Sequence, residues 1–421
     1  MKKIMAVLFS LLIILSFTAC GEKNDADNKN TSAENITEIT GDTQNQTQTT
    51  GKNEPEPLYP TLNLSDYPMA DVDWSFKGGV LTIKGSGRMP NGMSSSHPWN
   101  VHADETTKIV VEEGIVGIGE SNFYRFSSLE SVSLPSTLLY VGTCTFTDCY
   151  ELKSIELPEG LAEIKASAFE GCEELESVTL PSTLVKIGED AFSYCDSLTK
   201  VNIPNSVKSI GESAFASSGL TEFTFPESVV EIGRGAIRAC YSLESIKLYA
   251  SDDDVPNFMY DCSEDVKLEV GENYVVEDGI LYNKDKTVLI ACVDPNLKEL
   301  TVPSSVTKIA DYAFSSHKSI TTVNTGENTK IIGESAFYCC KALKEVTIGD
   351  SLEVVSRFAF SWCDILGSLD FPATVNKVEY GAFRGDEALT SVTFGAPRDQ
   401  IEYDDGDDDR LPENLIMTFG E

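Results

Sequence analysis

A segment of about 23 residues recurs along most of this chain, and it limits the possible folds more than any other feature. Each copy opens with an aliphatic residue, and a degenerate copy from about Thr106 precedes the clear ones. The clear copies open at Leu129, Leu152, Leu175, Leu198, Leu220, Leu243, Leu297, Ile320, Leu343, Leu366 and Leu389. A unit this short cannot form its own core, so the copies must stack as coils of a solenoid.

We number each repeat from its opening residue. Positions 1, 4 and 6 are aliphatic and positions 3 and 5 are polar, which predicts a short strand. Ala at 17, Phe at 18 and Cys at 21 share one face of a single predicted helical turn. Position 14 is often Gly, which predicts a tight turn with positive φ at Gly119, Gly142, Gly188, Gly211, Gly233 and Gly333.

Positions 3 and 5 should point outward along the strands and form a polar ladder without aromatic residues. Sugars and bases stack on aromatic rings, so this face is a poor glycan groove. The ladder is either a binding face for protein or a solvated sheet surface.

The motif Leu-x-x-Val-x-Leu-Pro-x-x-Leu-x-x-Ile-Gly-x-x-Ala-Phe-x-x-Cys resembles the BspA-like leucine-rich repeat family over residues 72–397. The lead-in from Asp73 to Pro90, followed by Pro98-Trp99, resembles the N-terminal cap of that family. The resemblance implies a leucine-rich-repeat solenoid on a bacterial surface, since several members are adhesins. It does not indicate the ligand.

The N-terminus has the features of a secretory signal. Lys2 and Lys3 precede an apolar run from Ile4 to Phe17 that is too short for a membrane span. The sequence Leu15-Ser-Phe-Thr-Ala-Cys-Gly21 resembles a bacterial lipobox, which implies lipidation of Cys20, for example with palmitate. Ordinary cleavage after Ala19 is the alternative. Residues 22–57 have no aromatic side chain, which predicts a disordered tether.

These observations predict seven segments. They are the signal peptide 1–19, the lipidated Cys20 with its tether 20–57, a β cap 58–105, a first repeat array 106–265, a β-hairpin insert 266–296, a second array 297–397 and an acidic C-terminal segment 398–421.

The interruption between the arrays is either a splice or a protruding recognition element, because insertions in solenoids gather on one face. Turn-forming residues at Asp278-Gly279 and Asn283–Lys286 favour a small hairpin in this interruption. Aromatic residues near it are our candidate protein-binding anchors, namely Tyr249, Phe258, Tyr260, Tyr274 and Tyr282.

The cysteines at position 21 are spaced along a line, which excludes a tetrahedral metal site. We interpret them as small buried residues with free thiols rather than disulfides. The scattered histidines, His97, His102 and His317, are interpreted as surface or cap residues. No nucleophile and base stand together, so we predict that the chain is not an enzyme and has no cofactor.

Acidic residues outnumber basic ones, 67 against 32, and the formal net charge of −35 argues against binding to nucleic acid or to anionic membrane. Two acidic runs are read as solvated charge, with weak calcium binding as the alternative. The calcium candidates are Asp252, Asp253, Asp254, Asp404, Asp405 and Asp407.

The sequence therefore predicts a monomeric, lipid-anchored, surface-displayed solenoid that binds an extracellular or cell-surface protein. Its membrane contact is the lipid on Cys20 alone. The alternative is a non-catalytic spacer, or a scaffold for extracellular polymer-degrading machinery.

Overall fold

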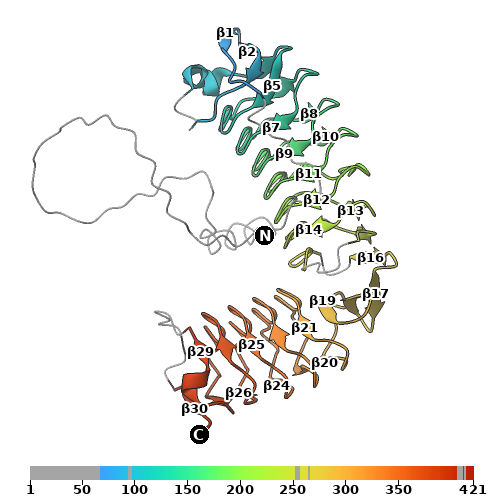
Figure 1. Ribbon diagram of the computed structural model, residues 1–421, viewed down its shortest axis with the longest axis vertical. Helices are drawn as coiled ribbons and strands as arrows, with labels where there is room; N and C mark the ends of the chain where they lie inside the picture. The colour runs from blue at the N-terminus through green and yellow to red at the C-terminus, as the bar shows by residue number, and fades with distance from the viewer. Residues whose placement is uncertain (1–66, 93–96, 252–256, 264–265, 405–410, 412–413) are drawn as a thin grey trace, which may run out of the picture. The chain divides into compact units, whose positions relative to one another are not determined.

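The computed structural model of the chain describes residues 67–92, 97–251, 257–263, 266–404, 411 and 414–421. They form a solenoid of stacked coils with strands on two faces (Figure 1). The predicted leucine-rich-repeat solenoid is therefore confirmed. The signal peptide, Cys20 and the tether lie outside the described residues.

One face, the strand face, is built from strands that begin at position 3 of the repeat and is extended by two strands of the N-terminal region. Apart from the antiparallel pair β1–β2, neighbours pair in parallel, as Ser154 does with Ser177 one repeat later. The strands are β1 (Asp73–Lys77), β2 (Val80–Lys84), β4 (Lys108–Val111), β6 (Ser131–Ser133), β8 (Ser154–Glu156), β10 (Ser177–Thr179), β13 (Glu222–Phe225), β15 (Ser245–Leu248), β16 (Lys267–Val270), β20 (Glu299–Thr301), β22 (Thr322–Asn324), β24 (Glu345–Thr347), β26 (Ser368–Phe371), β28 (Ser391–Phe394) and β30 (Ile416–Phe419).

The second face, the short-strand face, consists mainly of two-residue strands at positions 12 and 13. They are β3 (Gly87–Arg88), β5 (Ile115–Ile118), β7 (Tyr140–Val141), β9 (Glu163–Ile164), β11 (Lys186–Ile187), β12 (Ser209–Ile210), β14 (Glu231–Ile232), β21 (Lys308–Ile309), β23 (Ile331–Ile332), β25 (Val354–Val355), β27 (Lys377–Val378) and β29 (Glu402–Tyr403). The described residues also contain two short 3-10 helices, η3 (Pro98–Glu105) and η4 (Arg398–Gln400).

Positions 15–23 of each coil form a third side, which we call the turn edge. The predicted helical turn is wrong here, because positions 16 and 20 adopt left-handed conformations, for example Ser167 at φ 54° and Tyr194 at φ 56°. Two such residues four apart interrupt a helix. The amides of positions 16, 18 and 20 instead donate to carbonyls of the next coil, as Phe169 does to Ala191 at 2.9 Å.

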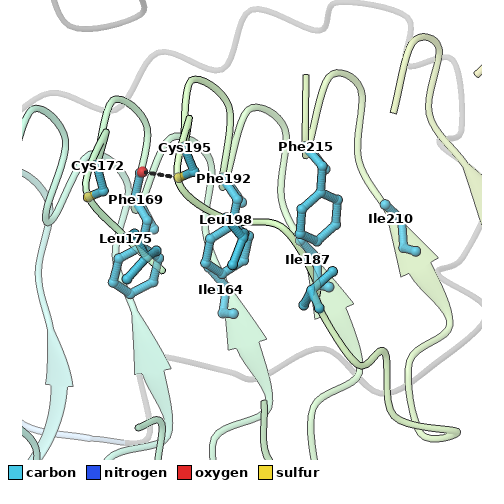
Figure 2. Close-up of a cluster of buried hydrophobic side chains, with 14 of the residues drawn as sticks. Ile164, Phe169, Cys172, Leu175, Ile187, Phe192, Cys195, Leu198, Ile210 and Phe215 are labelled. Carbon is cyan, nitrogen blue, oxygen red and sulfur yellow. Dashed lines mark hydrogen bonds between the residues drawn. The ribbon is translucent and has the colours of Figure 1, made fainter. Parts of the chain in front are cut away.

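The core is a stack of phenylalanines at position 18. Ring centroids of Phe146, Phe169, Phe192 and Phe215 follow one another at 5.2–5.3 Å (Figure 2). Aliphatic residues from both faces and the cysteines at position 21 surround the rings. Each coil with Phe at position 18 thus extends the core by one layer, whereas the coil that opens at Leu220 has the buried Ile237 at that position.

The interruption is a three-stranded antiparallel element of β17 (Tyr274–Glu277), β18 (Ile280–Asn283) and β19 (Val288–Cys292). The strand before it, β16, still pairs in parallel with β15, so the antiparallel part begins only at Tyr274. Leu281 and Ile290 join the core of the first array, whereas Ile280 and Leu289 join that of the second. The element therefore separates two cores, and its strands β18 and β19 are buried on both faces, whereas β17 is partly exposed.

The segment after residue 397 contributes a last coil to the stack. Its strands β29 and β30 pair in parallel with β27 and β28. Phe419 stacks on Phe394 at 5.2 Å, and the guanidinium of Arg398 lies 5.8 Å from the ring of Phe419. Arg398 thus covers part of the end of this aromatic stack.

The glycines at position 14 are needed for a reason other than the one predicted. None of the six has a positive φ. A Cβ on Gly188 would lie 2.6 Å from the backbone carbon of Lys165, and one on Gly211 would lie 2.5 Å from the amide nitrogen of Glu189. These glycines therefore allow the backbones of successive coils to approach closely.

We predict that Gly188→Ala lowers the free energy of unfolding by about 1–3 kcal/mol, because the backbone of the preceding coil must shift. Gly367→Ala is the control, since no atom lies within 4 Å of its added Cβ and its φ is ordinary. That variant should be unchanged, or more stable by up to about 1 kcal/mol. Urea unfolding followed by circular dichroism measures both, and equal stability of the two variants would contradict the close-approach argument.

Candidate binding surface

The strand face presents the polar ladder that the sequence predicts. In β8 and β10 the residues at positions 3 and 5 are exposed, while the aliphatic residue between them is turned inward. Some charged side chains of this ladder form ion pairs between neighbouring coils, namely Lys200 with Glu222 and Lys247 with Glu269. Lateral pairing of this kind leaves fewer uncompensated charges for a partner.

Three of the predicted aromatic anchors are core residues. Phe258 is fully buried, and Tyr274 and Tyr282 are each 4% exposed. They are buried because the interrupting element packs on a core with each of its faces, which the sequence does not reveal. Burial removes these side chains from any surface contact in this conformation.

The other two anchors retain some exposure. Tyr260 is half-buried and stacks on Tyr312 at 4.2 Å. Tyr249, next to the strand face, donates its hydroxyl to Glu269. Only Tyr249 therefore remains a candidate anchor on the strand side of the molecule.

Of the calcium candidates, the structure describes Asp404, whose amide donates to the carbonyl of Val378 at 2.9 Å. Asp252, Asp253, Asp254, Asp405 and Asp407 lie outside the described residues. Among the residues described, no three His, Cys, Asp or Glu side chains are grouped in a way that could hold a metal ion.

The histidines make structural contacts. His97 stacks on Trp99 at 5.0 Å, and burial lowers its pKa. His102 stacks on Phe76 at 4.1 Å. A ring nitrogen of His317 lies 3.0 Å from the carbonyl oxygen of Asp294. These contacts account for the three rings as packing elements.

The turn edge differs sharply in composition from the two faces. Five of the eight arginines and eight of the fifteen tyrosines of the chain fall at positions 15–23, but only two of its 24 lysines. Protein-binding surfaces favour Tyr, Trp and Arg over Lys. The residues are Arg125, Arg234, Arg238, Arg357, Arg384, Tyr124, Tyr150, Tyr194, Tyr241, Tyr260, Tyr312, Tyr338 and Tyr380.

Several of these side chains are open to solvent in the first array. Tyr241 is 74% exposed, Tyr194 45% and Tyr150 38%. Arg238 is held in place by a hydrogen bond from its Nε to the hydroxyl of Ser213 at 3.1 Å. Burial, reinforced by the charge of Glu170, raises the pKa of the nearby Asp190 to about 7. Rigid aromatic rings beside a fixed guanidinium suit a protein contact.

The turn edge of the second array has a similar character. Arg384 donates to the hydroxyl of Tyr380 at 3.2 Å, and the guanidinium of Arg357 lies 5.8 Å from the ring of Phe358. Trp362 is partly exposed and Ile365 is 49% exposed. Aromatic and arginine side chains thus recur on this side of both arrays.

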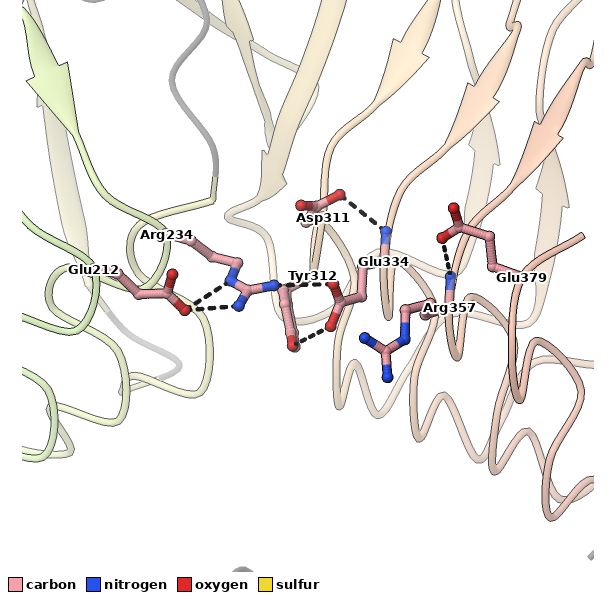
Figure 3. A network of polar contacts seen from close by, with 7 residues as sticks. All are labelled: Glu212, Arg234, Asp311, Tyr312, Glu334, Arg357 and Glu379. Carbon is pink, nitrogen blue, oxygen red and sulfur yellow. Dashed lines mark hydrogen bonds and ion pairs between the residues drawn. The ribbon is translucent and has the colours of Figure 1, made fainter. Parts of the chain in front are cut away.

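A polar network joins the turns of the two arrays (Figure 3). The guanidinium of Arg234 pairs with Glu212 at 2.7 Å and with Glu334, 100 residues away, at 3.0 Å. The same group lies 5.4 Å from the ring of Tyr312. Consequently the turn edge continues past the interrupting element.

Sequence reasoning missed this surface because its residues occupy several different positions of the repeat. Tyr194 is at position 20, Tyr241 at 22 and Arg238 at 19, so no single column stands out. Comparing positions 15–23 as a block with the strand positions would have revealed the concentration of Arg and Tyr. The concentration of Arg and Tyr is visible when positions 15–23 are taken together, and it is not visible at any single repeat position.

The model of the BspA type leucine rich repeat region matches in six copies over residues 102–218, 185–284 and 291–404, which is more than half of the chain. The chain belongs to this family. No helix in the described residues is long and apolar enough to cross a membrane. Comparison with curated protein sequences finds no match.

Among solved structures, this BspA-type chain is similar to a leucine rich cell surface protein from Faecalibacterium prausnitzii. The two are 24% identical with a TM-score of 0.58, over 85% of this chain and 96% of that chain. A leucine-rich repeat protein from Eubacterium ventriosum is 26% identical with a TM-score of 0.48, over 82% of this chain and 83% of that one.

The expected free thiols are confirmed for the six cysteines at position 21 of this BspA-type repeat. All six are buried, whereas Cys262, Cys292 and Cys339 are half-buried. Burial raises the pKa of Cys339, and it raises that of Cys292 to about 12. Since thiolates are the reactive form, the raised pKa values protect Cys292 and Cys339 in the folded chain.

We therefore predict that an aromatic disulfide reagent at pH 8 modifies the native protein slowly and chiefly at Cys339. Unfolding without reductant should release at least the nine thiols described as free. Cys339→Ser should remove the native phase and leave the remaining thiols reactive after unfolding. Release of only one or two thiols on unfolding would contradict the free-thiol core.

Proposed function

We propose that this chain is a lipid-anchored, non-catalytic module at the bacterial surface that binds an extracellular or cell-surface protein through its turn edge. The observation that carries the proposal is the concentration of Tyr and Arg along that edge, with Tyr241 and Tyr194 exposed beside the fixed Arg238. Central interface residues are drawn from these types.

The placement at the surface rests on the N-terminal sequence and on the relatives. The lipobox-like run ending at Cys20 provides an anchor, and the polar stretch to residue 57 provides a tether of about 30–36 Å r.m.s. span. The Faecalibacterium protein with the similar fold is described as a cell surface protein. We propose that the module acts as a monomer and uses neither a cofactor nor catalysis.

Membrane fractionation tests the anchor. In the full chain, Cys20→Ala should move the protein from the membrane fraction to the medium, because the lipid would be its only membrane contact. Thr18→Ser is a neighbouring control that retains both the acceptor thiol and the small residue before it. Persistence of the Cys20→Ala variant in the membrane fraction would remove the lipid anchor from the proposal.

The turn edge can be tested with immobilised residues 58–421 against a panel of extracellular-matrix and bacterial surface proteins. For a partner that binds, Tyr194→Ala with Tyr241→Ala should weaken affinity by at least tenfold, because rings of this type dominate contact energies. Thr179→Ala with Thr224→Ala on the strand face is the matched control and should change affinity less than twofold.

Two outcomes would oppose the proposal. If the strand-face pair or Tyr249→Ala abolishes binding while the turn-edge pair does not, the contact lies on the strand side. If no member of the panel binds, the rival function is favoured, namely a spacer or a scaffold for extracellular polymer-degrading machinery.

A further inference from the structure

The side chain at position 21 makes the same hydrogen bond in coil after coil. Five of the six cysteine thiols donate to the carbonyl of the phenylalanine 26 residues earlier, at 3.0–3.4 Å, and Cys240 donates to that of Phe215, 25 residues earlier, at 3.3 Å. The pairs are Cys149 with Phe123, Cys172 with Phe146, Cys195 with Phe169, Cys340 with Phe314 and Cys363 with Phe337. Position 21 is therefore a donor that ties each turn to the turn before it.

In the coil that opens at Leu366, position 21 is Asp386. Its side chain is fully buried, at 0% exposure. One carboxyl oxygen, Oδ1, accepts the amide of Cys363 at 2.6 Å. The other, Oδ2, is buried without a hydrogen-bond partner among the described residues. An ionised carboxylate left in this way would lack a counter-charge and half of its hydrogen bonds.

The acceptor that corresponds to this position is the carbonyl of Phe360, 26 residues earlier. In other coils the Phe carbonyl also receives the amide of the cysteine three residues on, as Phe337 does from Cys340 at 3.3 Å. The amide of Cys363 donates to Asp386 instead. In the described part of the chain, no hydrogen bond reaches the Phe360 carbonyl. The carbonyl that corresponds to the usual acceptor thus receives no hydrogen bond, and one oxygen of the side chain at position 21 has no partner.

We propose that Asp386 is held as a neutral carboxylic acid whose Oδ2 hydroxyl donates to the carbonyl of Phe360, and that loss of this proton loosens the C-terminal coils. The acid then performs the task of the thiol at position 21. It accepts from Cys363 and donates to Phe360 at once, which an ionised carboxylate cannot do.

The electrostatics around the side chain agree with this arrangement. Burial raises the pKa of Asp386 to about 9, the amides of Cys363 and Trp362 oppose the rise, and the charge of Asp364 on the preceding coil adds to it. Arg384 on the same turn donates to Tyr380, and Arg398 in the following coil lies over the rings of Tyr403 and Phe419.

The direction of the pH effect follows from proton binding. An unfolded Asp ionises near pH 3.9, so between about pH 4 and pH 9 the folded chain holds one more proton than the unfolded chain. The contribution of this group to stability is fully present below pH 4 and declines as the pH rises toward 9. Above pH 9 the folded state itself must carry the buried charge.

Trp362 is a suitable reporter because its ring packs against Gly385, the neighbour of Asp386. The amide of Trp362 also donates to the carbonyl of Arg384. In the full chain with Trp74→Phe and Trp99→Phe, the emission of Trp362 should change with a midpoint near pH 9. In Asp386→Asn the amide can accept from Cys363 and donate to Phe360, so this transition should vanish. The same variant should melt above the parent at pH 8 and together with it near pH 4.

Asp364→Asn is the matched control, because it removes a neighbouring charge and leaves the buried acid in place. It should keep the transition and move it to lower pH. Asp386→Cys introduces the residue that six other coils have at position 21 and should also abolish the transition. Retention of the transition in Asp386→Asn, or a melting temperature below that of the parent at pH 8, would overturn the proposal.

Discussion

The structure depends on the close stacking of one coil on the next. A single repeat has one Phe ring, a few aliphatic residues and a short strand, which cannot form a stable core alone. Stacking brings the rings of Phe169 and Phe192 to 5.2 Å and lets the amide of Phe169 donate to Ala191 in the next coil. Packing and backbone hydrogen bonds are therefore gained by the same approach of two coils.

That approach explains features of the repeat that local propensity does not. Gly at position 14 leaves room where two backbones meet, and left-handed residues at positions 16 and 20 aim alternate amides at the next coil. Ser167 and Tyr194 adopt this conformation without being glycine. The intercoil hydrogen bonds offset the cost, which is about 1–2 kcal/mol for each residue.

The repeat and its inward positions could be predicted because they obey simple alternation. Val178 lies between exposed Ser177 and Thr179 as the pattern requires. The helical turn was predicted wrongly, since Ala, Phe and Cys at positions 17, 18 and 21 suit a helical face as well as a series of turns. The aromatic anchors Tyr274 and Tyr282 were misplaced, because an antiparallel element with a core on each side resembles a protruding hairpin in sequence.

The acidic character of the chain and its proposed binding surface have different locations. Residues 250–278 and 399–421 carry a large share of the net negative charge, whereas five of the eight arginines lie on the turn edge. Eight of the 24 lysines lie in strands and only two at positions 15–23. On the strands a flexible ammonium remains hydrated beside Glu. An arginine such as Arg238 keeps its charge in a partly buried setting near Tyr194 and Tyr260. Lysine and arginine therefore occupy different positions of the repeat, and this difference is a stronger guide to a binding surface than the total charge.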